Sequence, residues 1–227
     1  MKLTYYGHAC FGVNIGEHHL LFDPFIRYNE LAKHIDIEKI EADYIFLSHG
    51  HQDHIADAYD IAIRTGATIV SNYEITTWFE GKGIKKTHPM NHGGKWKFPF
   101  GTAKYVSAIH SSSLPDGTYA GNPGGFVVET NEGNFYYSGD TALTMDMQLI
   151  PLTAGKLNFA LLPIGDNFTM GIDEAVLASD FIKCNRIIGL HYDTFGFIKI
   201  NHAEAQQKFK EKGKELILLK IGETIEV

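Results

Sequence analysis

The chain has 227 residues, of which 44% are hydrophobic and 21% are charged, and its formal net charge is -7 at pH 7. This composition is typical of a folded globular protein and excludes a disordered chain, and the negative charge gives no general attraction to nucleic-acid phosphates. No run of about 18 apolar residues is present and the first residues lack the apolar segment of a secretory signal, so we expect a cytoplasmic protein without a membrane span.

Short β-strands are expected to open the chain, because apolar residues alternate with polar ones between turns that contain glycine. The first three strands are expected to be antiparallel, and the fourth is a nearly continuous apolar run. Their expected ranges are 2–6, 10–15, 19–23 and 43–48. A helix is expected over 54–66, where Ile55, Tyr59 and Ile63 recur at helical spacing and Gly66 can end it.

The rest of the chain reads first as mainly β-structure and then as alternating strands and helices. The expected strands are 68–71, 95–100, 102–110, a hairpin over 125–140, 158–165, 186–191 and 215–220. The expected helices are 73–83, 173–183 and 203–213. Because no Pro- or Ser-rich linker and no sequence repeat divides the chain, we expect a single domain over 1–227.

The stretch LSHGHQDHIAD, residues 47–57, places His49, His51, Asp53 and His54 directly after the fourth expected strand. Imidazole nitrogens and carboxylate oxygens are ligands of Zn²⁺ and similar ions, and one ion does not need so many ligands from so short a segment. Two ions are therefore expected, one held by His49 and His51 and the other by Asp53 and His54.

Three further candidate ligands stand at the ends of later expected strands. They are His110 after AKYVSAI, Asp140 in YYSGDT and His191 after RIIGL. Because sites in α/β proteins gather where strands end, we expect these side chains to complete the two ion sites.

The order of these residues resembles the five motifs of the metallo-β-lactamase superfamily: Asp23 in LLFDP, the cluster at 49–54, His110, Asp140 and His191. The stretches GHACF, PIGDNFTMG and HYDTF are similar to the small single-domain metal-dependent hydrolases of that family, which are related to the ascorbate-6-phosphate lactonase type. The resemblance covers almost the whole chain. It implies an α/β fold, the four-layer αββα sandwich, with the site at one edge of two mixed sheets.

The resemblance also implies a ligand set, residue by residue. His49, His51 and His110 would bind a first divalent ion, Asp53, His54 and His191 would bind a second, and Asp140 would bridge them. Zinc is favoured as the metal, and manganese, iron and nickel remain open, because the ligands include no thiolate. A carboxylate at Asp140 replaces the Cys of true β-lactamases, which argues against antibiotic hydrolysis.

The expected reaction is hydrolysis of a small polar ester, lactone or phosphodiester by a metal-bound hydroxide. The candidate catalytic residues are Asp53, which would orient the hydroxide, and His8, which would donate to a substrate oxyanion or contact a ligand. A turn histidine without a function is an equally good explanation of His8. Asp23 is expected to support the His49 loop. The other candidate pocket residues are Asp166, Asn167, Thr169, Tyr192 and Thr194, for which loop hydrogen bonds and helix capping are equally good explanations.

Two other functions remain open. One is a metal-stabilised binding or sensor protein without hydrolytic turnover, and the other is a nuclease, which the net charge of -7 and the missing basic stripe disfavour. The expected partner is a small-molecule substrate, with no membrane partner, and a homo-oligomer remains open.

Overall fold

Two mixed β-sheets pack face to face in the computed structural model, which describes residues 1–227. The first sheet has the strand order β14-β1-β2-β3-β4-β5-β6, and the second has the order β13-β12-β11-β10-β9-β8-β7. The strands of the first sheet are β1 Lys2–Gly7, β2 Cys10–Ile15, β3 His18–Phe22, β4 Tyr44–Phe46, β5 Thr68–Asn72, β6 Thr87–Met90 and β14 Thr224–Glu226. Those of the second are β7 Lys95–Phe98, β8 Gly101–Ser107, β9 Gly124–Thr130, β10 Gly133–Tyr137, β11 Phe159–Pro163, β12 Arg186–Leu190 and β13 Glu215–Ile217.

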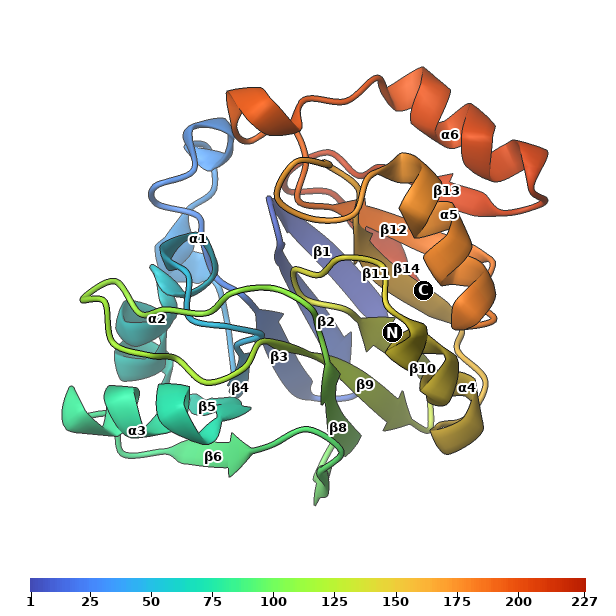
Figure 1. The fold of residues 1–227 in the computed structure, drawn as a ribbon. Coiled ribbons are helices and arrows are strands. Elements are labelled where there is room, and N and C mark those ends of the chain that lie inside the picture. The colour runs from blue at the N-terminus through green and yellow to red at the C-terminus, as the bar shows by residue number, and fades with distance from the viewer.

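Helices cover the outer faces of both sheets. The α-helices are α1 Gln52–Ile55, α2 Ala58–Thr65, α3 Tyr73–Gly81, α4 Ile150–Thr153, α5 Ile172–Phe181 and α6 His202–Glu211. Short 3-10 helices span Glu30–Ala32, Ile37–Lys39, Met145–Leu149 and Gly196–Ile198. Figure 1 shows α2 and α3 on one side of the paired sheets and α5 and α6 on the other. None of the helices has the length and apolar character that crossing a membrane requires.

The two sheets repeat one pairing pattern. In the first sheet β14, β1, β2 and β3 pair antiparallel, as expected for the first three strands, and β3 to β6 pair parallel. In the second sheet β7 to β10 pair antiparallel, and β10 to β13 pair parallel. Parallel strands bring their carboxyl ends to the same edge, so each sheet offers a row of loops there.

Apolar side chains alternate between the faces of each strand and so build three buried layers. On β3, Leu20 and Phe22 face the other sheet, whereas Leu21 packs toward the helices. On β10, Phe135 and Tyr137 lie between the sheets, whereas Tyr136 packs under the helices of the second half. Three apolar layers separate four layers of secondary structure, which confirms the expected αββα sandwich.

The expected helix over 54–66 is divided into α1 and α2. Asp57 lies at the break, where its backbone N–H donates to Pro24 O and its buried carboxylate accepts from Ile26 N at 2.6 Å. These bonds tie the chain to the loop after β3 and turn it between the two helices. Gly66 ends α2 as predicted, with a φ of 71° that suits glycine.

Two strands, β6 and β14, were not predicted from the sequence. The strand β6 contains Pro89, which argues against a strand in sequence but is tolerated here because β6 is the edge strand of its sheet. The strand β14 pairs with β1 through Lys2 and Glu226, a contact that no local pattern indicates. The expected strands that carry His110 and Asp140 end earlier, at Ser107 and Tyr137, so both residues lie in loops.

The Phe22→Ala substitution is expected to lower the free energy of unfolding by about 3–5 kcal/mol, because it leaves a cavity between the sheets. The Phe22 ring is fully buried and stacks on Phe11 at 4.5 Å and on Phe46 at 4.9 Å between centroids. Urea denaturation measures the loss. The matched control Leu152→Ala, at a side chain 74% exposed on α4, should change the unfolding free energy by less than about 0.5 kcal/mol, and equal losses would contradict this packing argument.

Candidate metal centre

The candidate residues lie at one edge of the sandwich, in the loops that follow strands and, for Asp53 and His54, in the short helix α1. In the first sheet His8 follows β1, Asp23 follows β3, and the 49–54 cluster comes shortly after β4. In the second sheet His110, Asp140 and His191 follow β8, β10 and β12. The structure therefore brings together residues that lie up to 183 positions apart in the sequence.

A buried carboxylate, Asp23, anchors the loop that carries the histidine cluster. Its Oδ1 accepts a hydrogen bond from Ser48 N at 2.8 Å, and its Oδ2 accepts from the Ser48 hydroxyl, from Tyr137 OH and from His54 Nδ1 at 2.7 Å. Because a carboxylate only accepts, His54 must carry a proton on Nδ1, so its neutral ring has the lone pair on Nε2. Asp23 thus fixes the tautomer of neutral His54. The Ser48 hydroxyl, which bonds to both Asp23 and His49, links the carboxylate to a second histidine in a chain of hydrogen bonds.

His49 is oriented through the same chain. The Ser48 hydroxyl donates its only hydrogen to Asp23, so its oxygen accepts from His49 Nδ1 at 2.9 Å, and the His49 lone pair is again on Nε2. That nitrogen lies 2.9 Å from His51 Nδ1, and His110 completes a group whose ligand atoms lie within 4.8 Å of one another. This first group can hold a metal ion.

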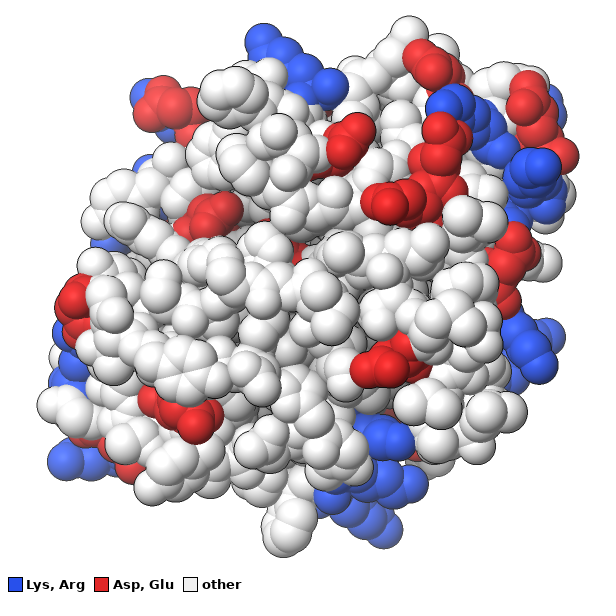
Figure 2. Space-filling model, in the orientation of Figure 1, with Lys and Arg blue, Asp and Glu red and all other residues white.

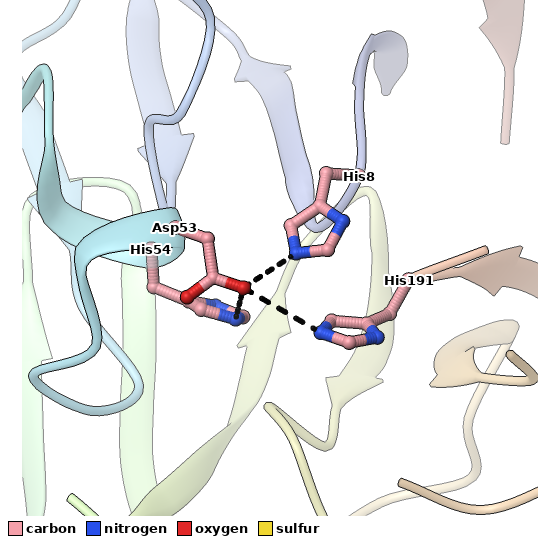
Figure 3. A group of neighbouring side chains, drawn as sticks. All are labelled: His8, Asp53, His54 and His191. Carbon is pink, nitrogen blue, oxygen red and sulfur yellow. Dashed lines mark hydrogen bonds and ion pairs between the residues drawn. The ribbon is translucent and has the colours of Figure 1, made fainter. Parts of the chain in front are cut away.

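A second group lies beside the first and is drawn in Figure 3: His8, Asp53, His54 and His191. Asp53 Oδ2 is 3.0 Å from His8 Nε2 and 3.9 Å from the Nε2 atoms of both His54 and His191. The rings of His54 and His191 are nearly parallel, and their Nε2 atoms point toward the same carboxylate. This group also has the donor atoms and the spacing of a metal site.

Asp140 lies between the two groups. Its Oδ2 is 2.9 Å from His191 Nε2, 3.2 Å from His54 Nε2 and 3.7 Å from His110 Nε2. Burial would raise the pKa of the Asp140 carboxyl, but His191 and His54 outweigh burial and hold this pKa well below its usual range. Asp140 is therefore an anion that reaches both groups.

The electrostatics of the centre favour a bound cation. Burial opposes a charge on His54, but Asp140 and Asp53 outweigh burial and raise the pKa of His54 well above its usual range. Burial, and then His54, lower the pKa of His49, so this imidazole stays neutral. The two carboxylates thus attract positive charge to the centre, and a divalent ion can supply it in place of a proton.

Gly139 allows the two halves to meet at this point. Its φ of 62° lies in the left-handed region that glycine adopts without steric cost, and a Cβ at this position would lie 2.5 Å from Gly124 O and 2.8 Å from Ser48 Cβ. The loop that carries Asp140 therefore packs directly on the loop that carries His49. His8, Asp23 and His191 also have positive φ values, of 56°, 40° and 55°, and such strained residues often lie at functional sites.

His8 is held as a neutral ring against Asp53. Burial, and then His191, lower the pKa of His8 to about 4. Its Nδ1 lies 3.0 Å from Thr194 Oγ1, and its Nε2 lies 3.0 Å from Asp53 Oδ2. The tautomer that satisfies both contacts accepts from Thr194 and donates to Asp53. His8 therefore fixes the orientation of Asp53.

An open pocket of about 970 Å³ lies over the centre. His51, Asp53, His110, Asp140 and His191 line its floor. Its walls come from residues that the sequence analysis did not select: Phe25, Tyr28, Gln52, Ser111, Phe168, Phe195, Gly196 and Phe197. Several of them directly follow motif residues, as in the stretch DTFGF after His191, and that proximity was the signal available in the sequence.

The predicted pocket residues lie at different depths. Thr194 lines the pocket, whereas Asp23 is buried behind it. Asp166 and Asn167 line a neighbouring hollow, and Tyr192 is buried in the layer under the helices. The hydroxyl of Thr169 bonds to Met170 O. Four predicted residues are therefore not part of the pocket wall and have structural contacts instead: Asp166, Asn167, Thr169 and Tyr192.

Comparison with known proteins decides the family. A family model described as a beta-lactamase superfamily domain matches residues 2–191. The chain belongs to the metallo-β-lactamase superfamily. Within it, proteins named UPF0173 metal-dependent hydrolase in Christiangramia forsetii and Flavobacterium johnsoniae are 60% and 58% identical to this chain, and both matches cover 100% of each chain.

A solved structure of the superfamily has the same fold. Igni18, described as a novel metallo hydrolase from Ignicoccus hospitalis, is 33% identical, covers 99% of this chain and 97% of its own, and superposes with a TM-score of 0.89. With its family, fold and curated relatives agreeing, this superfamily member is a metal-dependent hydrolase.

Proposed function

We propose that this metal-dependent hydrolase binds two divalent ions and hydrolyses an ester, lactone or phosphodiester of a small molecule. His49, His51 and His110 hold the first ion, Asp53, His54 and His191 hold the second, and Asp140 bridges them. The observation that carries the proposal is the position of Asp140, within 3.7 Å of nitrogens from both groups. The whole chain, 1–227, acts as one hydrolase domain.

The residues present fit such ions. His54 Nε2 is buried without a hydrogen-bond partner, although its Nδ1 is bonded to Asp23, so this nitrogen is available to a metal ion that displaces its proton. The lone pair of His49 is also on Nε2, which lies 2.9 Å from His51 Nδ1 in the first group. Nitrogen and oxygen donors without sulfur favour zinc and also suit manganese, iron and nickel.

The chain's own residues prepare the reaction. Two bound ions supply hydroxide from water near neutral pH and polarise the oxygen of the scissile group. Asp53, held by His8, is placed to orient the attacking water from the floor of the pocket. Asp140 and residues of both groups line the open pocket, so a scissile bond that enters it would come within reach of both groups.

Removal of metal tests the proposal. The protein as purified should contain about two ions per chain, and exhaustive chelation should abolish hydrolysis, because the water then loses its activation. Metal analysis beside ester, lactone and phosphodiester assays measures both quantities. Added Zn²⁺ or Mn²⁺ should restore the rate. A rate that persists after confirmed loss of metal would refute the mechanism.

A further inference from the structure

Five aromatic side chains form the walls of the pocket: Phe25, Tyr28, Phe168, Phe195 and Phe197. They come from the loops after β3, β11 and β12. Tyr28, Phe168 and Phe197 are 58%, 48% and 78% exposed, which is unusual for rings gathered in one place. An exposed apolar cluster that rims a reactive centre is typical of a binding surface.

Four of the rings form two pairs, one tilted and one edge to face. Phe25 and Phe195 lie with their centroids 6.4 Å apart, and both also contact His8, at 5.6 Å and 5.2 Å. Phe168 and Phe197 meet edge to face at 6.3 Å. The first pair lies close to the metal centre, whereas the second is exposed at the mouth. An apolar group that enters the pocket therefore meets aromatic surface along its path.

The pocket offers no side-chain cation. Neither Lys nor Arg is among its lining residues, and its full charges are the carboxylates of Asp53 and Asp140. Figure 2 shows Lys and Arg mainly along the margins of the face it presents, with few in the middle. A phosphate or carboxylate away from the reacting bond would thus find no side-chain cation to pair with in the pocket wall.

We propose that the substrate is an uncharged carboxylic ester, lactones included, whose acyl part is apolar and lies against Phe195 and the Phe168–Phe197 pair. This proposal rests on the proposed hydrolase function and selects one of its substrate classes. In the reaction the oxygen of water joins the acyl carbon, the acyl C–O bond breaks, and the released alcohol takes a proton. The acid and the alcohol then leave through the open mouth.

The test uses the metal-loaded protein and a series of p-nitrophenyl esters from acetate to octanoate, beside the anionic bis(p-nitrophenyl) phosphate. Each added methylene that reaches aromatic surface should raise kcat/KM by about threefold over the first few carbons. The kcat/KM of each ester should exceed the kcat/KM of the phosphodiester. Preference for acetate or for the phosphodiester would overturn the proposal.

Variants locate the acyl part. Phe197→Ala is expected to lower the ratio of octanoate to acetate kcat/KM by about tenfold, because the mouth of the pocket loses its aromatic surface. Since Phe197 is 78% exposed, the variant should remain folded. Leu152→Ala, an exposed apolar side chain outside the pocket, is the matched control and should keep the parent ratio. An unchanged ratio in Phe197→Ala would overturn the assignment.

Binding separates this inference from the proposed function. If no metal form hydrolyses any ester, the hydrolase proposal fails, and calorimetric titration with the unreactive ketones 2-decanone and 2-butanone decides the inference. The substrate inference is supported if 2-decanone binds more tightly than 2-butanone and if Phe197→Ala weakens the binding of 2-decanone about tenfold. Equal binding of both ketones refutes the inference. Sedimentation tests whether the rings instead join two copies: a dimer that Phe197→Ala dissociates, with an unchanged ester ratio, would also refute it.

Discussion

Replacing Asp140 with Ala is expected to leave about one bound ion per chain in place of about two and to lower turnover by about 10³-fold. Asp140 is the carboxylate that contacts His54 and His191 in one group and His110 in the other. Two cations about 3.5–4 Å apart repel each other, and the substitution removes the negative charge that offsets this repulsion. The second ion should be lost first, because only Asp53, His54 and His191 then hold it.

Metal content per chain, measured beside circular dichroism, checks this expectation. His110→Ala is the informative comparison, since it should weaken the first ion instead of the second. His34→Ala removes an exposed histidine that belongs to neither group and should change neither metal content nor turnover. A folded Asp140→Ala protein that keeps both ions would refute the bridging role.

Replacing Asp23 with Asn should weaken metal binding by about 100-fold without removing any ligand. At the position of Asp23 Oδ2 the amide nitrogen would face three donors, from Ser48, His54 and Tyr137. The flipped amide would instead face the Ser48 backbone N–H, which anchors the histidine loop. In the first orientation His54 accepts from the amide, which moves the His54 proton from Nδ1 to Nε2. The lone pair that a metal needs is then absent from the centre.

Histidine ¹⁵N shifts of the metal-free protein, recorded at a pH above the raised pKa of His54, report its tautomer, and competition with a chelator measures metal affinity. Asp57→Asn is a close control, because Asp57 is equally buried and accepts from Ile26 N and Arg27 N but contacts no histidine. Both variants should lose about 1–3 kcal/mol of unfolding free energy. If Asp23→Asn keeps the parent affinity, or if Asp57→Asn loses as much, the tautomer argument is wrong.

The grouping of the candidate metal-binding residues was largely predictable, because these residues are marked locally in the sequence. His49 to His54 form a dense cluster after an apolar strand, and His110, Asp140 and His191 each come shortly after a strand. Strand ends meet at one edge, so strand order alone brings these residues close. The sequence did not indicate that Asp23 would control His54 through a hydrogen bond, because that contact depends on the packing of β3 against β4.

The pocket wall was not predictable for a similar reason. Phe168 and Phe197 are of a residue type that is usually buried in the core, and only the tertiary structure shows that they are exposed at the pocket. The break between α1 and α2 also depends on a distant partner, since Asp57 bonds to the loop after β3. Local periodicity describes what one segment prefers, whereas these features depend on which segments meet.

The division of the centre between the two sheets links metal supply to the lifetime of the protein. The segments after β1, β3 and β4 supply one side and the loops after β8, β10 and β12 supply the other, so metal bound between them would hold the two halves of the sandwich together. Free metal at about a thousand times its dissociation constant adds about 4 kcal/mol to the stability of the folded chain. In a cell short of metal this link between the sheets would be missing. Newly made metal-free chains would then be unfolded, and exposed to proteases and aggregation, for a larger fraction of time than metal-bound chains.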